Sequence, residues 1–514
     1  MFSKVNSGGL HGIDGYIVQV EADVSTGLPG FHMVGYLASE VKEAEERVRT
    51  AIRNSGFQLP VMKVTVNLSP ADVRKEGTAY DLPVAVSVLS SYGVIDSCEL
   101  EHSAFVGELG LDGQIKPVHG VLSIVLAMKE AGIRRCFLAE ENVSEGLAIG
   151  DIRIVGVRSL TEVANLLNHP DQIRERNLDR GKLAEDFSVL KDSVDFTEVS
   201  GQQLLRRGTE IAVAGRHNLL YIGPPGSGKS MVARRIPTIM PVLSREEQLE
   251  ISRVYSICGL LPAGKPLLQT RPFRAPHHTI SPQALTGGGM VPKPGEISLA
   301  SRGVLFLDEF PEFQKKTLEI LRQPMEDHQV TVSRVHGSYA FPAHFMLVAA
   351  MNPCPCGYYP NRDRCTCTGQ QVKNYLNKIS GPLLDRIDIC VEAAPITYQE
   401  IRGNHKNESS EAIRLRVEKA REIQKKRFAR KNIFFNSEMG NAEIKRYCKL
   451  EKADEEFMEH IFEKMNLSAR GCNKILKVAR TIADLAGEEQ IQREHLGEAI
   501  GYRDLEDKYW GKGV

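Results

Sequence analysis

The segment at residues 221–230, YIGPPGSGKS, restricts the fold of this chain more than any other feature. Glycines in such a loop let successive backbone N–H groups face inward around phosphates, and the loop joins a buried strand to the N-terminus of a helix. Lys229 is placed to reach the outer phosphates of a nucleotide, and the Ser230 hydroxyl is placed to ligate magnesium. The pattern predicts a strand–loop–helix unit of an α/β domain. Its expected phosphate-binding residues are Gly223, Pro224, Pro225, Gly226, Ser227, Gly228, Lys229 and Ser230.

A second motif follows at residues 303–309, GVLFLDE, which has the pattern of a buried strand ending in two carboxylates. Asp308 is expected to hold the magnesium shell, and Glu309 to polarise the attacking water. A glycine-rich loop alone can be an ordinary turn, and an acidic pair alone can be a solvated strand end. Because both motifs occur in this order, we interpret them as one site that binds ATP with Mg²⁺ and hydrolyses it.

Four regions differ in pattern along the chain of 514 residues, which is too long for one hydrophobic core. Residues 1–167 mix short alternating strands with amphipathic helices, as in an α+β domain. Residues 168–193 are polar and charged, which favours a linker. Residues 194–395 alternate strands and helices in the manner of a parallel sheet between helices, and residues 396–514 predict a helical lid. The expected fold class is therefore α/β, with an α+β domain before the P-loop core.

The overall composition is that of a soluble globular protein. Lys plus Arg and Asp plus Glu number 65 each, so any contact with nucleic acid must come from a local patch or a pore. No apolar run approaches the roughly twenty residues that a membrane span needs, and the N-terminus leads into glycines and polar residues. We expect a cytoplasmic protein with no membrane contact.

Residues 345–352, FMLVAAMN, predict another buried strand, whose terminal Asn352 can orient the attacking water beside Glu309; the alternative is a helix or turn cap. With SGPLLDRID and SARG further on, the chain resembles AAA+ ATPases. In that superfamily Asn352 matches the sensor 1 position and Arg470 the sensor 2 arginine. Arg386 matches the arginine finger that a neighbouring subunit inserts toward the γ-phosphate. The resemblance implies a homo-oligomer, specifically a hexameric ring.

Three longer motifs narrow the resemblance. The sequences FRAPHHTIS at residues 273–281, GGG at 287–289 and MNPCPCG at 351–357 are similar to magnesium-chelatase-like AAA+ proteins. The order of regions over nearly the whole chain resembles the YifB/ComM family, which implies single-stranded or branched DNA as the substrate of a helicase or branch-migration motor. Such a motor acts in recombination or natural transformation. The alternative is a magnesium-chelatase-type or MoxR-like remodelling ATPase with protein or metal-insertion partners.

The first region resembles the proteolytic, S5-like domain of Lon-type proteases through residues 74–81, RKEGTAYD, and 113–122, GQIKPVHGVL. The serine nucleophile and the lysine base of that family fall at Ala79 and Leu122. A Ser–Lys dyad needs a hydroxyl and an amine within reach of one another. We therefore expect no protease activity, and a domain retained for assembly or partner binding.

Two groups of metal-ligating residue types occur in the ATPase region. His277 and His278 are adjacent and do not easily share one metal, so we assign them to loop packing. The other group is a cluster of two cysteine pairs, and in each pair one residue separates the two cysteines. Structural Zn²⁺ is the leading interpretation, and reduced thiols or redox chemistry are the alternatives. The cluster consists of Cys354, Cys356, Cys365 and Cys367.

Two further segments are candidates for DNA contact. Residues 330–342 alternate β-type residues around a polar turn, which predicts a hairpin whose Arg334 and His336 contact phosphates or form a solvated turn. The basic run at residues 425–431, KKRFARK, is either a solvated helix end or a second nucleic-acid contact.

Overall fold

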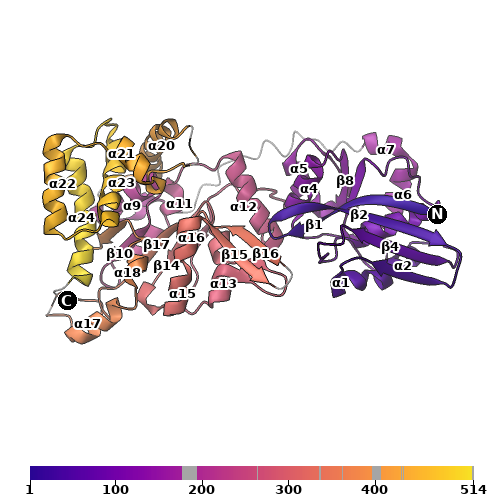
Figure 1. The fold of residues 1–514 in the computed structure, drawn as a ribbon, viewed down its shortest axis with the longest axis horizontal. Coiled ribbons are helices and arrows are strands. Elements are labelled where there is room, and N and C mark those ends of the chain that lie inside the picture. The colour runs from indigo at the N-terminus through magenta and orange to yellow at the C-terminus, as the bar shows by residue number, and fades with distance from the viewer. Residues whose placement is uncertain are drawn as a thin grey trace.

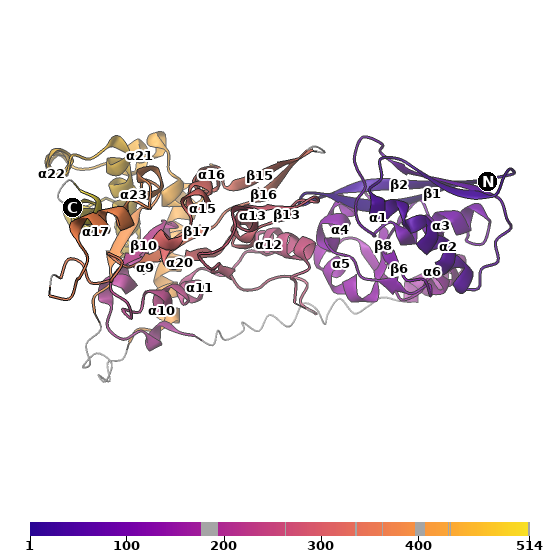
Figure 2. The ribbon, with the colours of Figure 1, turned by 90° about the horizontal axis from the view of Figure 1, so that it is seen from below.

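The computed structural model describes residues 1–175, 194–262, 264–334, 337–361, 363–395, 407–429, 431 and 433–511. Most of the predicted linker, the beginning of the predicted lid, His336 and Arg430 lie outside these ranges. Figures 1 and 2 show an elongated molecule, with an N-terminal sheet at one end and the C-terminal helices at the other. Within the described ranges, no helix is long and apolar enough to cross a membrane.

The N-terminal part is built on a seven-stranded mixed sheet with the order β3-β4-β2-β1-β5-β8-β9. Antiparallel pairing joins β1 to β2 and β2 to β4, whereas β5, β8 and β9 are parallel. This is the α+β arrangement predicted for the region. Its strands are β1 (Phe2–His11), β2 (Asp14–Ser25), β3 (Gly30–Val34), β4 (Lys63–Ser69), β5 (Ser103–Val106), β8 (Arg135–Ala139) and β9 (Arg153–Val157). Its longer helices are α2 (Ala44–Asn54), α3 (Asp81–Ser91), α4 (Val121–Glu130), α5 (Val143–Ile149) and α6 (Leu160–Asn168).

The central part contains a five-stranded sheet with the order β11-β14-β17-β10-β18, in which every neighbouring pair is parallel. Every residue of the three inner strands is buried, as continuous apolar runs predict for a sheet covered on both faces. The predicted parallel sheet is thus confirmed. The strands are β11 (Phe273–Arg274), β14 (Val304–Leu307), β17 (Met346–Met351), β10 (Leu219–Ile222) and β18 (Ile389–Glu392).

Two hairpins belong to this central part, and the longer one reaches the N-terminal part, where the Tyr339 ring lies 4.6 Å from that of His11. β15 (Gln329–Arg334) pairs antiparallel with β16 (Gly337–Pro342), which confirms the predicted hairpin. A shorter pair, β12 (Gly287–Gly288) with β13 (Lys293–Pro294), lies in the segment after β11. The remaining helices of the central part are α9 (Gln203–Gly215), α10 (Lys229–Ala233), α11 (Ile236–Ile239), α12 (Arg245–Cys258), α13 (Pro282–Thr286), α14 (Glu296–Leu299), α15 (Lys315–Ile320), α16 (Arg322–Asp327), α17 (Gly369–Leu376) and α18 (Gly381–Leu384).

The C-terminal part is helical, as predicted, and covers one face of the central sheet. Tyr221 of β10, Val417 of α20 and Ile475 of α23 belong to one apolar core. The polar end of the last helix returns to the sheet, because Lys508 and Tyr509 both donate to the Glu392 carboxylate. These helices are α20 (Ser410–Arg427), α21 (Asn441–Tyr447), α22 (Lys452–Lys464), α23 (Ala469–Ala486) and α24 (Arg493–Trp510).

Helix α12 joins the N-terminal part to the central part (Figure 1). The Arg253 guanidinium donates to Ser123 Oγ at 2.9 Å and to Asp14 Oδ1 at 2.7 Å. One turn later, Ser256 Oγ donates to Glu145 Oε2 at 2.5 Å. Polar contacts therefore fix the orientation of α12 against the N-terminal sheet.

Candidate nucleotide-hydrolysis site

The P-loop lies at the carboxyl end of β10, the strand between β17 and β18. Gly228 adopts φ +83°, a left-handed conformation that favours glycine, and immediately precedes α10. The loop is tied to the neighbouring strand, because the Gly223 N–H donates to Met351 O at 3.2 Å. Backbone N–H groups at a helix N-terminus attract an anion, so the geometry of this loop fits the predicted phosphate-binding role.

Lys229 lies in the mouth of the P-loop. Its amine donates to Gly223 O at 2.7 Å, to Pro224 O at 2.8 Å and to Asn352 Oδ1 at 3.3 Å. Burial lowers the pKa of the amine to about 8, although the Asp308 carboxylate opposes that shift. A phosphate in the loop would supply the negative charge that this desolvated cation favours.

The two residues predicted to bind magnesium, Ser230 of the P-loop and Asp308, are in direct contact. Ser230 Oγ donates to Asp308 Oδ2 at 2.6 Å, so the hydroxyl and the carboxylate converge from α10 and from the end of β14. Mg²⁺ is a hard cation that binds oxygen and usually takes only one or two protein carboxylates beside phosphates and water. Ser230 and Asp308 therefore fit the role of its protein ligands, where the ion would neutralise charge on the transferred phosphate.

Glu309 follows Asp308 with φ +53°, an uncommon conformation for a non-glycine residue. The side chain is 60% exposed, and its Oε2 lies 3.1 Å from His278 Nδ1. The assignment of His278 to loop packing therefore missed a contact with the predicted catalytic carboxylate. Because β11 and β14 are adjacent parallel strands, residues that follow them meet at one edge of the sheet.

Asn352 directly follows β17, which lies between β14 and β10. That strand order places the amide between the acidic pair and the P-loop, and the bond to Lys229 demonstrates the proximity. The geometry fits the predicted role of orienting a water beside Glu309.

Arg386 lies at the amino ends of the parallel strands, whereas the P-loop of its own chain lies at their carboxyl ends. Asn218, the residue before β10, donates from Nδ2 to Arg386 O at 2.9 Å, whereas the P-loop begins after the other end of β10. The guanidinium donates to Pro382 O and to Glu326 Oε1, both at 2.5 Å. The structure therefore does not bring Arg386 to its own nucleotide site.

Arg470 lies exposed in the first turn of α23. One turn further on, the Lys474 amine donates to Ile387 O at 2.7 Å, directly beside Arg386. Among the described residues, no hydrogen bond or ion pair links Arg470 to the P-loop. The two predicted arginines are thus carried by neighbouring segments at the amino ends of the strands.

The four clustered cysteines converge in the loop that follows Asn352. The Sγ atoms of Cys354 and Cys356 are 3.3 Å apart, and that of Cys365 lies 3.8 Å and 3.5 Å from them. All four sulfurs, including that of Cys367, lie within 4.8 Å of one another. Four sulfurs at about 2.3 Å from a tetrahedral Zn²⁺ would be about 3.8 Å apart, so the donor set and its dimensions fit zinc.

The residues of the N-terminal part that match the Lon dyad offer no nucleophile or base. Leu122 is fully buried, and Ala79 packs against an apolar cluster. The neighbouring Ser123 is buried, donates to Ile13 O at 2.6 Å and accepts from Arg253. Ser123 therefore joins the N-terminal part to α12 rather than facing a substrate.

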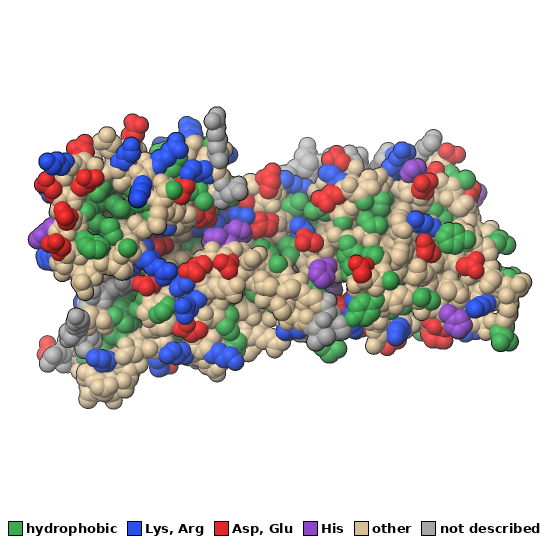
Figure 3. All heavy atoms as spheres, viewed as in Figure 1, with side chains coloured by type: hydrophobic (Ala, Val, Ile, Leu, Met, Phe, Trp, Pro, Cys, Tyr) green, Lys and Arg blue, Asp and Glu red, His purple; other side chains and the backbone are tan. Residues whose placement is uncertain are grey.

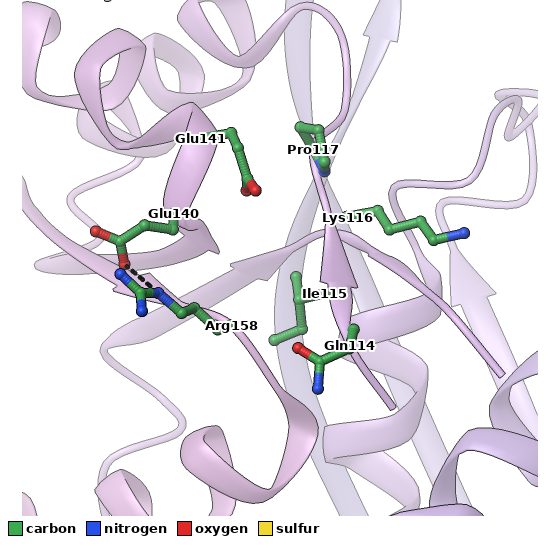
Figure 4. Close-up of a pocket in the computed structure, with 7 residues that line it drawn as sticks. All are labelled: Gln114, Ile115, Lys116, Pro117, Glu140, Glu141 and Arg158. Carbon is green, nitrogen blue, oxygen red and sulfur yellow. Dashed lines mark ion pairs between the residues drawn. The ribbon is translucent and has the colours of Figure 1, made fainter. Parts of the chain in front are cut away.

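A cavity of about 480 Å³ lies elsewhere in the N-terminal part. Figure 4 shows Glu140 and Arg158, an ion pair at 4.0 Å, on one side of it, and Lys116 extending away from them. Its described lining includes no serine, threonine or cysteine. The cavity therefore supplies no hydroxyl or thiol nucleophile.

A P-loop on an inner strand of a parallel five-stranded sheet, with acidic and amide residues ending the next strands, defines an ATPase of the AAA+ class. The chain matches the family described as magnesium chelatase, subunit ChlI, over residues 195–401. Further matches to ChlI regions cover residues 20–142 and 407–503. The chain belongs to the magnesium-chelatase-like AAA+ family that includes ComM and YifB.

Two relatives support this assignment over nearly their full length. The chain is 42% identical over 495 residues to the competence protein ComM of Haemophilus influenzae, with 96% of each chain covered. It is 42% identical over 508 residues to YifB of Escherichia coli, with 98% of this chain and 97% of the relative covered. A Lon protease of Mycolicibacterium smegmatis is 23% identical over 164 residues, which cover 30% of this chain and 21% of the protease.

Proposed function

We propose that the protein is a ring-forming ATPase that drives a helicase or branch-migration reaction on single-stranded or branched DNA. The observation that supports a ring most strongly is that Arg386 lies apart from the other predicted catalytic residues of its own chain. Lys229, Asp308 and Asn352 converge at the carboxyl edge of the sheet, but Arg386 lies at the amino edge. An arginine that stabilises the transferred phosphate would then come from a neighbouring subunit. The ring would be a hexamer, as the family resemblance implies.

DNA contact would come from the two hairpins of the central part. Arg334 Nε on β15 donates to Gly289 O at 3.2 Å, so the longer hairpin is braced against the shorter one. Next to Gly289, Met290 is 90% exposed. Figure 3 shows acidic and basic side chains interspersed over the visible face, which agrees with a local grip rather than a broad basic surface.

The proposed biological setting is recombination or natural transformation in the cytoplasm. The Haemophilus influenzae relative is named a competence protein, which supports that setting. The runner-up, a remodelling ATPase acting on protein or metal-insertion partners, shares the same nucleotide chemistry.

One experiment separates these functions. The ATPase rate is measured with single-stranded, duplex and forked DNA, and unwinding of the fork is followed in parallel. Stimulation and unwinding are expected with forked DNA, and Arg334→Ala should reduce both while basal ATPase stays nearly intact. An ATPase indifferent to every DNA, with no unwinding, would refute the DNA motor.

A second experiment tests the shared site. Arg386→Ala and Lys229→Ala proteins should each be inactive in ATP hydrolysis, because each lacks a charge on the phosphates. Mixed rings should regain part of the activity, since some interfaces then combine an intact P-loop with an intact arginine. Inactive rings whose mixed composition has been demonstrated would contradict action in trans.

We also propose that Cys354, Cys356, Cys365 and Cys367 hold one structural Zn²⁺ per chain. Elemental analysis of protein purified without chelators is expected to give about one zinc per chain. A metal-free protein that is fully active would refute this site.

A further inference from the structure

The turn that carries the first two cysteines lies directly against the P-loop. Gly357, the residue after Cys356, has φ +87°. A Cβ atom built on Gly357 would lie 2.4 Å from Pro225 Cδ and 2.8 Å from Pro225 Cγ. The backbone of this turn therefore packs against a P-loop proline at a distance that leaves no room for a side chain.

The same segment also carries the sensor amide. Asn352 lies two residues before Cys354, and its Oδ1 accepts from Lys229. Cys354 is fully buried, and its sulfur accepts from the Tyr359 N–H at 3.4 Å. Cys354 is thus a buried, hydrogen-bonded residue between Asn352, which contacts Lys229, and the turn that contacts Pro225.

A second chain of contacts reaches the P-loop from the C-terminal helix. The Tyr359 ring lies 6.3 Å from that of Tyr509, and the Tyr509 hydroxyl donates to Glu392 Oε1 at 2.9 Å. The next residue, Ala393, donates from its N–H to Ile222 O at 2.7 Å, at the last position before the P-loop. The loop that carries the four cysteines, residues 354–367, therefore contacts the P-loop directly at Pro225 and contacts α24, which bonds to the strand beside the P-loop.

We propose that a metal ion bound by the four cysteines braces the P-loop, so that nucleotide affinity depends on metal occupancy. This inference rests on the zinc site proposed above. The two cysteine pairs come from opposite ends of the loop, and the ion joins them. Without the ion, the Cys365 and Cys367 end is released, and the turn at Gly357 loses the support that holds it against Pro225.

The test uses the full chain with Cys365→Ser, which removes a ligand that is not part of the turn at Gly357. Cys98→Ser, at an exposed cysteine of the N-terminal part, is the control. Zinc content, circular dichroism and affinity for a fluorescent ADP analogue with excess Mg²⁺ are measured for both. Cys365→Ser should lack zinc and bind the analogue at least about tenfold more weakly, whereas Cys98→Ser should match the wild type.

A second measurement keeps the inference testable if Cys365→Ser does not fold. Wild-type protein is depleted with a zinc-selective chelator in excess Mg²⁺, and ZnCl₂ or CoCl₂ is then added back. Depletion should weaken nucleotide binding and either metal should restore it. Zinc-free protein that binds nucleotide as tightly as the loaded form would overturn the inference. That outcome would not count against the proposed DNA motor, because the motor is tested by the DNA-stimulated ATPase of the wild-type protein.

Discussion

Replacing Gly357 with alanine adds a single methyl group to the turn that packs against the P-loop. Its left-handed φ of +87° costs a non-glycine residue about 1–2 kcal/mol. The new methyl would also lie 2.4 Å from Pro225 Cδ, and relieving such an overlap in a packed site typically costs about 1–3 kcal/mol. The proline ring is rigid and belongs to the P-loop, so part of this strain should move the loop.

The expected result is weaker nucleotide binding in a protein that keeps its metal. If about 1.4–2.8 kcal/mol of the strain appears as displacement of the P-loop, affinity falls by about ten- to a hundredfold. A fluorescent ADP analogue measures this affinity, and elemental analysis checks that zinc content is unchanged, because no cysteine has been altered.

Gly369→Ala is the matched control, since a Cβ at Gly369 meets no atom within 4 Å. It should bind nucleotide as the wild type does. If Gly357→Ala also retained wild-type affinity, the contact with Pro225 would not position the P-loop.

The other predictions concern turnover and stability. Glu309→Gln should keep ATP binding and stop hydrolysis, because the water loses its polarising carboxylate; single-turnover assays with bound-nucleotide analysis measure both. In the proposed ring, Glu326→Gln should reduce turnover about tenfold at unchanged nucleotide affinity, because the guanidinium of Arg386 loses its ionic partner, whereas Asp327→Asn should not. Burial, with the Arg302 and Arg216 cations nearby, lowers the pKa of His344 to about 3 from 6.5. The unfolded chain then binds a proton that the folded chain does not, so stability is retained above pH 6.5 and falls by up to about 1.4 kcal/mol per pH unit below it. Urea unfolding between pH 7 and 5 should show this slope, and His344→Gln should reduce it.

The residues of the candidate nucleotide site could be predicted because most of them lie in two short, contiguous segments of the sequence. The run from Gly223 to Ser230 carries the loop and two functional side chains, and Asp308 with Glu309 ends an apolar strand. Their contacts follow from parallel pairing, which places the carboxyl ends of strands at one edge. The Lys229 and Ser230 hydrogen bonds in the structure agree with that prediction.

The contacts between separate segments were not predictable in the same way. His278 meets Glu309 only because β11 is the edge strand beside β14, and Gly357 meets Pro225 only because β17 is adjacent to β10. Neither neighbour relation is encoded in residue spacing. A signal for His278 existed in its position shortly after a short strand, but a strand of two residues has too weak an alternation to be recognised.

The strand order also explains why Arg386 lies far from the P-loop of its own chain. Each strand of a parallel sheet brings one end to the nucleotide and the other end to the opposite edge. Arg386 precedes β18 and is bonded to Asn218 at the amino end of β10, so no side-chain rotation carries it to its own P-loop. Glu326, which accepts a hydrogen bond from Arg386, lies in the last turn of α16, and the hairpin strand β15 follows soon after. A displacement of that hairpin by DNA would therefore move Glu326 and, through the ion pair, the arginine offered to the next subunit. In the proposed ring, the ion pair between Glu326 and Arg386 would thus link the DNA-contacting hairpin of one subunit to the hydrolysis site of its neighbour.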